Sequence, residues 1–404
     1  MSELSYLEKL LDRAEVDWLP LEEVFDIFAG GDKPTDAFSD VETDEINVPI
    51  LSNGIDKKSL YGWTNRAKIN EPSLTVSARG TIGWTSYRDR PFFPIIRLLV
   101  LTPKTKVNLK YAYYYMKTIE KRYKVAESGI PQLTKPMIKD TLFPIPCPNN
   151  PEKSLAIQGE IVRILDAFTS LTTELTTELN MRKKQYNYYR NKLLTFQDGE
   201  VPHLPMGQYD VGTFIRGSSL QKKDFTETGV GCIHYGQVYT YYGTCAHKTK
   251  SFVSEEFAQK ARKAQTGDLI IATTSENDED VCKAVVWLGE GEIAISGDAC
   301  FYKHNLNPKY VAYFFQTEQF EEQKRKYITG AKVKRVNADN LAKILIPVPP
   351  LAAQSRIVSI LDKFDALTNS ISKGLPREIS LRKKQYEYYR DQLLSFPKSL
   401  KVGT

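Results

Sequence analysis

The sequence predicts two mixed α/β (α+β) domains, separated by two long antiparallel coiled-coil helices and related by a pseudo-twofold internal repeat. RKKQYNYYRNKLLTF at 182–196 returns as RKKQYEYYRDQLLSF at 382–396, with eleven of fifteen positions identical. Around both copies, apolar residues recur at spacings of three and four, which is typical of a coiled-coil seam. A longer region that differs between the halves precedes each copy. The chain is therefore a duplication with near-constant helices and variable domains.

Further matches set the expected boundaries. IVRILDAF at 161–168 matches IVSILDKF at 357–364, and IPCP at 145–148 matches IPVP at 346–349. YLEKLL at 6–11 resembles the end of the first constant segment, so we expect the two chain ends to lie close together. The expected parts are a first variable region at 1–148 with a short helix at 2–12, a spacer helix at 149–199, a second variable region at 200–349, a spacer helix at 350–397 and a tail at 398–404.

The two spacer helices are expected to differ in continuity. No proline lies between Pro151 and Pro202, so one helix of roughly 40 residues, about 60 Å long, can run through the first copy. In the second copy, Gly374 and Pro376 predict an interruption, with Pro376 beginning the second piece. The narrow seams favour pairing of the two helices with each other. The alternative is that each helix lies on its own globular half.

Each variable half has the pattern of a small α/β domain. Short apolar runs bounded by glycine and proline predict strands, among them 48–54, 74–86, 95–103, 231–243, 267–275 and 283–303. One helix per half is expected, in LKYAYYYMKTIEKRY at 109–123 and in PKYVAYFFQTEQFEEQKRKY at 308–327. Their clustered tyrosines favour packing of the helix on the sheet, and stacking on nucleic-acid bases is the alternative.

Composition and termini fit a cytoplasmic protein. The N-terminus is charged from its third residue, and the longest apolar run, near 95–101, is broken by Arg97 and too short to cross a bilayer. Five cysteines without CxxC spacing predict reduced thiols, not disulfides or a zinc site. Lys and Arg exceed Asp and Glu by 55 to 49, which permits binding to a polyanion without requiring it. We expect no membrane partner and no bound metal.

Signatures of catalysis are missing from the sequence. It contains no GxxxxGK[ST], HExxH or GxSxG motif. NPKY at 307–310 lacks the second proline of the NPPY signature of amino-methyltransferases, and its repeat partner is NLKY. A doubled chain without a repeated catalytic constellation favours a two-headed binder. We therefore predict no catalytic residue and no cofactor bound by this chain.

Two unlike domains on a rod suit a DNA target. B-DNA repeats every 34–36 Å or so, so a rod of tens of ångströms can hold two domains over two major-groove segments. Because the variable halves differ, the target is expected to be bipartite and asymmetric, with an unread spacer. The near-constant helices suggest that a common partner docks on them twice.

These repeated motifs resemble a known family. IPxP followed by IVxILDxF and RKKQYxYYR in both halves is similar to type I restriction–modification specificity subunits, and TTELTTEL at 172–179 resembles the type IC branch, whose relatives carry TAEL. The resemblance covers essentially the whole chain and is specific in the helices. It implies target recognition domains that bind double-stranded DNA, two modification (methyltransferase) subunits docked on the helices, and restriction subunits joined through the complex. S-adenosylmethionine, ATP and Mg²⁺ are then expected in the partner subunits.

Two other functions stay open. A stand-alone tandem sequence-specific DNA-binding regulator would be complete without partners, and a methyltransferase acting alone would bind its own cofactor.

The TTEL repeat carries a mechanical expectation. Four helical residues advance about 6 Å and turn a net 40° or so, whereas one base pair turns about 36° and rises about 3.4 Å. Loss of one TTEL unit is therefore expected to shorten the unread spacer by about one base pair.

Side chains that read base edges are Arg, Lys, Asn, Gln, Ser and Thr on loops and helix ends. In the first variable half, we predict DNA contacts for Ser52, Asn53, Lys57, Arg79, Thr81, Arg88, Arg90, Gln132 and Lys135. In the second half, the predicted contacts are His234, Tyr235, Gln237, Lys248, Lys250, Thr274, Ser275, Asn277, Lys332, Lys334 and Arg335. Lys248 and Lys250 are expected on phosphates. The alternative for each residue is a solvated surface side chain.

The cations of the constant helices are candidates for partner binding. They are Arg182, Lys183, Lys184 and Arg190, with their copies Arg382, Lys383, Lys384 and Arg390. Their recurrence fits docking of a common partner, and the alternative is that they face water.

Overall fold

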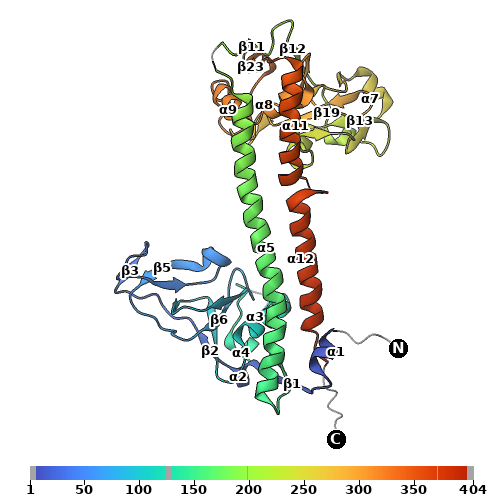
Figure 1. Ribbon diagram of the computed structural model, residues 1–404. Coiled ribbons are helices and arrows are strands. Elements are labelled where there is room, and N and C mark those ends of the chain that lie inside the picture. The colour runs from blue at the N-terminus through green and yellow to red at the C-terminus, as the bar shows by residue number, and fades with distance from the viewer. Residues whose placement is uncertain (1–5, 124, 126–129, 198, 371, 398–404) are drawn as a thin grey trace, which may run out of the picture. The chain divides into compact units, whose positions relative to one another are not determined.

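The computed structural model describes residues 6–123, 125, 130–197, 199–370 and 372–397. It divides into two units, residues 1–173 with 380–404 and residues 174–379. We call the sheet domain at 16–146 the first head and the sheet domain at 203–347 the second head (Figure 1). The long helices are α5 (Pro151–Leu194), α11 (Leu351–Thr368) and α12 (Gly374–Leu393).

The first head contains two four-stranded sheets and one strand pair. The antiparallel sheet has the order β2 (Phe25–Ala29), β9 (Leu98–Pro103), β6 (Ser73–Ser77), β7 (Thr85–Arg88). The mixed sheet has the order β3 (Phe38–Ser39), β5 (Leu60–Thr64), β4 (Val48–Leu51), β8 (Phe93–Pro94). The pair is β1 (Val16–Pro20) with β10 (Leu142–Pro146). The helices of this unit, besides the long ones, are α1 (Tyr6–Leu11), α2 (Leu21–Val24), η1 (Asp56–Ser59), α3 (Leu109–Ile119) and α4 (Lys135–Ile138).

The second head is built in the same way with additions. Its five-stranded sheet has the order β12 (Gly212–Arg216), β21 (Ala299–His304), β17 (Leu269–Ala272), β19 (Ala284–Trp287), β14 (Cys245–Ala246). Its four-stranded sheet has the order β15 (Ser251–Val253), β13 (Val230–Ile233), β20 (Ile293–Ile295), β16 (Lys263–Ala264). The strand pairs are β11 (His203–Pro205) with β23 (Leu345–Pro347) and β18 (Thr274–Ser275) with β22 (Lys334–Arg335). The helices are η2 (Lys222–Asp224), α6 (Tyr235–Thr240), α7 (Glu255–Lys260), α8 (Pro308–Phe314), α9 (Glu318–Arg325) and α10 (Ala338–Leu341).

Strand register makes the two heads equivalent residue by residue. In the first head, Leu101 of β9 lies opposite Ile27 and Leu74. In the second head, Tyr302 of β21 lies opposite Phe214 and Leu269 in the same way. The internal repeat that the sequence predicts is therefore confirmed in the heads as well as in the helices.

The predicted difference between the two spacer helices is confirmed. Helix α5 is continuous over 44 residues, about 66 Å at 1.5 Å per residue. The second copy is broken between α11 and α12, and α12 begins at Gly374, two residues before Pro376. Gly374 has a φ of +72°, and a Cβ at this position would lie 2.5 Å from the carbonyl oxygen of Ala366. Glycine is therefore required at this junction.

Aromatic stacking pairs the long helices antiparallel. Phe168 of α5 stacks on Tyr389 of α12, with ring centroids 5.2 Å apart. In the other unit, the repeat-related Phe364 of α11 stacks on Tyr189 of α5 at 5.6 Å. The N-terminal part of α5 thus packs on α12, and the C-terminal part of α5 packs on α11. Each helix also packs on its own head, because Leu165 shares a core with Tyr111, and Leu361 shares one with Tyr310.

Two expectations for the heads are wrong. The one helix per half expected at 308–327 is two helices, because Thr317 caps a new one by accepting a hydrogen bond from the Phe320 N–H at 3.2 Å. The strand expected at 231–243 ends at Ile233, and α6 follows it. A reciprocal cap starts α6: the His234 ring accepts from the Gly236 N–H at 3.2 Å, and Gln237 Oε1 accepts from the His234 N–H at 3.0 Å.

The expected closeness of the chain ends concerns residues 1–5 and 398–404, which lie outside the described residues. The described segments next to them share the first unit's core, with Leu7 and Leu11 of α1 in the same cluster as Leu393 and Phe396. The Trp18 Nε1–H also donates to the Pro397 carbonyl oxygen at 3.1 Å. The short helix expected at 2–12 is observed at 6–11.

All five cysteines are free, as expected, and four of them are buried. Among the helices of the described ranges, none combines the length and the apolarity that a bilayer crossing needs.

Candidate nucleic-acid interface

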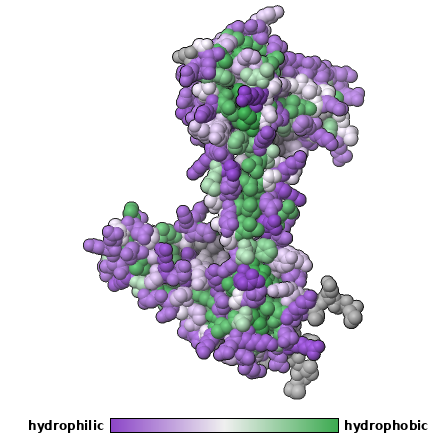
Figure 2. All heavy atoms as spheres, viewed as in Figure 1, coloured by the Kyte–Doolittle hydropathy of each residue, from purple (hydrophilic) through white to green (hydrophobic). Residues whose placement is uncertain are grey.

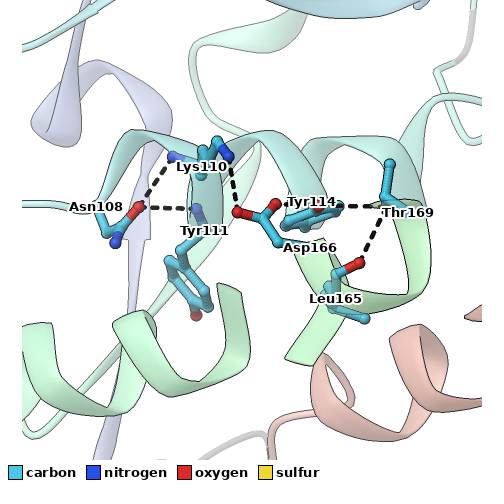
Figure 3. Close-up of polar contacts among 7 residues, drawn as sticks. All are labelled: Asn108, Lys110, Tyr111, Tyr114, Leu165, Asp166 and Thr169. Carbon is cyan, nitrogen blue, oxygen red and sulfur yellow. Dashed lines mark hydrogen bonds and ion pairs between the residues drawn. The ribbon is translucent and has the colours of Figure 1, made fainter. Parts of the chain in front are cut away.

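A cluster of polar contacts attaches the first head to α5 (Figure 3). The Asn108 side chain caps α3 by accepting from the N–H groups of Lys110 and Tyr111 at 3.0 and 3.2 Å. Lys110 Nζ then pairs with Asp166 Oδ2 at 2.7 Å, and the Tyr114 hydroxyl donates to Asp166 Oδ1 at 2.6 Å. One carboxylate of the long helix therefore receives two side chains of α3, and the cap fixes where they point.

The second head repeats the main contacts of this attachment. Asn307 caps α8, Lys309 Nζ pairs with Asp362 Oδ2 at 2.7 Å, and the Tyr313 hydroxyl donates to Asp362 Oδ1 at 2.6 Å. The Asn307 N–H donates to the buried Gln354 at 2.8 Å. The Asn108 N–H makes the same bond to the buried Gln158, also at 2.8 Å. The recurring N-x-K-Y sequence thus has a structural role in both heads.

The tyrosines of these helices serve the interior. Tyr111 and Tyr310 are fully buried, and their hydroxyls donate to the carbonyl oxygens of Pro144 and Pro347 at 2.9 and 3.0 Å. Burial raises the pKa of both hydroxyls above the ordinary range. Packing against the sheet is therefore confirmed over base stacking for this pair.

Four of the predicted DNA-contacting residues of the first head form one connected group. The Ser52 hydroxyl donates to Asn53 Oδ1 at 3.2 Å. Asn53 Nδ2 donates to the Arg79 carbonyl oxygen at 2.9 Å. Arg79 Nε donates to Gln132 Oε1 at 2.9 Å. We call this group the first polar edge. It joins the ends of β4 and β6 to the loop before α4.

Backbone hydrogen bonds define the equivalent edge in the second head. Ala78 accepts from the Leu133 N–H at 2.8 Å, and Thr273 accepts from the Val336 N–H at 3.1 Å. Because these residues are equivalent, Thr274 occupies the place of Arg79, and Arg335 occupies the place of Gln132. The first polar edge therefore has its arginine at Arg79, whereas the second polar edge has its arginine, Arg335, at the position equivalent to Gln132.

The remaining predicted residues of the first head lie apart from this group. Lys57, Arg90 and Lys135 are exposed, and Thr81 is half-buried. Arg88 is directed inward, since its Nε donates to Thr75 Oγ1 at 3.2 Å and its Nη2 donates to Ser59 Oγ at 3.1 Å. Burial lowers the pKa of Arg88, and the nearby Asp56 opposes that shift. Arg88 is therefore committed to internal bonds in this structure.

Several predicted residues of the second head also have internal roles. His234 is buried and caps α6 together with Gln237, whose Nε2 donates to Ser251 Oγ at 2.7 Å. Burial lowers the pKa of His234, Lys222 lowers it further, and Asp298 raises it. Asn277 is exposed, and its Oδ1 accepts from the Asp280 N–H at 2.7 Å, which closes a turn.

The other predicted residues of the second head stand on its surface or at its edge. Lys334 pairs with Asp278 at 3.1 Å, whereas Lys248, Lys250, Lys332 and Arg335 are exposed. Tyr235 and Ser275 are half-buried. Hydrophilic residues cover most of the visible surface of both heads (Figure 2). The run Lys332–Arg335 includes β22, and α10 and β23 separate it from the long helix α11.

The cations of the long helices divide into two kinds. Lys183, Lys184, Lys383 and Lys384 are exposed on α5 and α12. Each arginine contacts a neighbour on its own helix. On α5, Arg182 pairs with Glu178 at 2.7 Å, and Arg190 lies over the Tyr186 ring. On α12, Arg382 donates to Gln385, and Arg390 pairs with Asp391.

Sequence reasoning missed Asp166 and Asp362, which receive the attachments of the heads. The signal was present, because both aspartates lie in the matching segments IVRILDAF and IVSILDKF. Throughout the described ranges, no three His, Cys, Asp or Glu side chains are grouped so that they could hold a metal ion.

Comparisons with known proteins agree with this duplicated design. The family model described as type I restriction modification DNA specificity domain matches twice, at residues 15–182 and 207–381. The chain is 36% identical to the EcoR124I/EcoR124II specificity subunit of Escherichia coli, covering 98% of each chain. It is 31% identical to a putative specificity subunit, S.HindORF215P, of Haemophilus influenzae, over 97% of this chain and 98% of that one.

A crystal structure of a type I restriction–modification S subunit from M. genitalium has a similar fold. It matches with a TM-score of 0.56 at 15% identity, over 96% of this chain and 97% of that chain.

Proposed function

This chain belongs to the type I restriction–modification DNA specificity family, and on that premise we propose that each head reads one half of an asymmetric bipartite site in cytoplasmic DNA. The chain itself performs no catalysis in this proposal. It selects the sequence on which modification and restriction subunits act. Its relatives are named as specificity subunits of type I restriction enzymes, which supports this role.

The observation that carries the proposal is the contrast between attachment and edge. Asp166 and Asp362 hold the two heads by the same pair of side chains at the same distances. The polar edges, in contrast, differ at equivalent positions. Two heads that are attached in the same way but carry different side chains at their polar edges suit two unlike half-sites on one DNA molecule.

We further propose that the paired long helices set the unread spacer and dock two modification subunits. Lys184 and Lys384, with Tyr188 and Tyr388, are repeat-related and exposed, and the two tyrosines are 58% and 61% exposed. A single kind of partner surface would meet the same residues twice. The TTEL repeat in α5 suggests the type IC branch.

Cofactors belong to the partners in this proposal. S-adenosylmethionine, ATP and Mg²⁺ would be held by modification and restriction subunits, and this chain would bind none of them. Calorimetric titration of the isolated chain with S-adenosylmethionine is expected to show no binding.

The decisive experiment expresses the modification subunits of the same system with and without this chain and maps methylated adenine across the genome. With the chain present, we expect one motif with two different half-sites and a fixed unread spacer. Without it, we expect no methylation at that motif.

Two outcomes would contradict the proposal. A motif that is unchanged without the chain would remove its role in specificity. Tight binding of the isolated chain to one DNA sequence, with no methylation in the presence of the modification subunits, would point instead to a stand-alone regulator.

A further inference from the structure

The turn before β9 and the turn before β21 carry opposite charges at one equivalent position. The Arg97 carbonyl oxygen accepts from the Ala78 N–H at 2.8 Å, and the Asp298 carbonyl oxygen accepts from the Thr273 N–H at 3.0 Å. Arg97 and Asp298 therefore stand at the same place in the two heads.

Both side chains are exposed at the polar edges. Across the described parts of the chain, neither side chain makes a hydrogen bond or an ion pair, although the Asp298 carboxylate raises the pKa of the nearby His234. Arg97 lines a pocket of about 450 Å³ with Ser52, Asn53 and Lys58. Asp298 lines a pocket of about 380 Å³ with Thr274, Arg335 and Arg216. The charged side chain in each head thus shares a pocket with predicted DNA contacts, Ser52 and Asn53 in the first head and Thr274 and Arg335 in the second.

The backbone at Arg97 and Asp298 is fixed, whereas the side chains of both residues are exposed. The core strand begins at the next residue, Leu98 or Ala299, and both are buried. In the second head, the Thr273 hydroxyl adds a further hydrogen bond to the Asp298 carbonyl oxygen at 2.9 Å. A charged group on a fixed backbone loses less conformational freedom when it binds than one on a mobile loop.

The opposite charges suit opposite base edges. Guanine presents two acceptors in the major groove, N7 and O6, which an arginine contacts in bidentate fashion. A carboxylate accepts from an exocyclic amino group, as on cytosine N4. We propose that this turn residue determines specificity in each head, Arg97 selecting guanine and Asp298 selecting a base with a major-groove amino group, cytosine or adenine.

The inference rests on the proposed function, because it assumes that each head reads a half-site. The test uses the complete complex of this chain with its modification subunits. Methylation motifs are mapped for the wild type, Arg97→Asp and Asp298→Arg. Each substitution is expected to change the preferred base at one position of one half-site by about tenfold or more. Arg97→Asp removes a bidentate arginine contact and Asp298→Arg introduces one, and such a contact discriminates on that scale. The other half-site is expected to stay the same.

Lys104→Asp is the matched control for Arg97→Asp. Lys104 is exposed and follows the same strand at its other end, about 20 Å away at 3.3 Å per residue. We expect the motif of this variant to be that of the wild type. For any variant complex that does not methylate, the motif is taken from sequences that the complex selects out of a random DNA pool.

Three results would overturn the inference. The first is an unchanged motif in both charge-reversed variants, and the second is the same motif change in Lys104→Asp. The third is loss of DNA selection in both charge-reversed variants together with an unshifted motif in Arg97→Lys and Asp298→Asn. All three leave the proposed function intact if the wild-type complex reads a bipartite motif. Absence of such a motif in the wild type would instead refute the proposed function.

Discussion

The two heads are nearly the same where they meet the long helices and different where they end in a polar edge. At the attachment, Asn, Lys and Tyr of each head meet Gln and Asp of the helix with distances that agree within about 0.1 Å. At the edge, Arg79 and Gln132 of the first head correspond to Thr274 and Arg335 of the second. The strands between these regions share one register.

This contrast shows how one fold separates the residues that attach a head from the residues that we propose for DNA recognition. Attachment depends on buried amides and on carboxylates at fixed spacing in a helix, so each change there leaves a polar group without a partner. The edge is built on strand ends and loops, where a side chain can change without disturbing the core.

The largest expected effect comes from removing the buried tyrosine that both heads share. Tyr111→Ala and Tyr310→Ala each delete a fully buried ring and a hydroxyl bond to a proline carbonyl. We expect each to lower the free energy of unfolding by about 3–5 kcal/mol, measured by urea denaturation. Tyr209→Ala, at a fully exposed residue, is the control. A large difference between the two core variants would break the equivalence of the heads.

Acid is expected to affect the heads unequally. Burial lowers the pKa of His304 to about 4, and Pro103 occupies its place in the first head. The folded ring stays neutral while the unfolded ring takes up a proton below about pH 6.5. The lowered pKa of His304 therefore contributes to the free energy of unfolding above pH 6.5, and this contribution is lost as the pH falls toward 4. The expected loss in the free energy of unfolding is about 2 kcal/mol between pH 7 and pH 5. Urea denaturation of His304→Gln at both pH values should show a smaller loss, and an equal loss would refute this assignment.

Smaller effects are expected from the paired attachment carboxylates. Asp166→Ala and Asp362→Ala each remove the carboxylate that accepts from a lysine and a tyrosine hydroxyl, which we expect to cost about 1–2 kcal/mol after solvent screening. The Tyr114 hydroxyl keeps a second partner, Thr169 Oγ1 at 3.4 Å. The Asp362 variant should be the more destabilised, because Lys309 is 29% exposed and Lys110 is 45% exposed. Asp→Asn at each position keeps an acceptor for the tyrosine and serves as the control. The reverse order of the two alanine variants in thermal unfolding would contradict the comparison.

No effect on either head is expected from deleting residues 176–179, one TTEL unit of α5. After the deletion, Glu174 stands four residues before Arg182 and replaces Glu178 in its ion pair. Methylation mapping should show a spacer shorter by about one base pair and two unchanged half-sites. An altered half-site would mean that the helix acts on recognition as well as on spacing.

The long helices could be predicted almost completely, because the signals that determine them are local and occur twice. The seam spacing and the absence of proline predict α5, and Gly374 with Pro376 predicts the break. The strand cores of the heads followed from apolar runs. Helix α6 was missed because its apolar residues also fit a strand, and the cap by His234 and Gln237 decides the outcome.

The polar edges could be predicted only in part. Ser52, Asn53, Arg79 and Gln132 were chosen by residue type, and the structure joins them through hydrogen bonds. Arg88 was chosen on the same grounds and lies inside. The equivalence of Arg97 and Asp298 follows from strand register, which the sequence alone does not define when loops between strands differ in length.

The attachment by Asp166 and Asp362 has an evolutionary consequence. A replacement domain would be seated by the same helix if it kept the capped N-x-K-Y helix start, the second tyrosine and the apolar residues that share a core with the helix. Genetic exchange between relatives within the matching segments would therefore introduce a new head that already fits the attachment residues of the long helix. Diversification of such proteins would then proceed by substituting whole modules, without waiting for compensating point mutations.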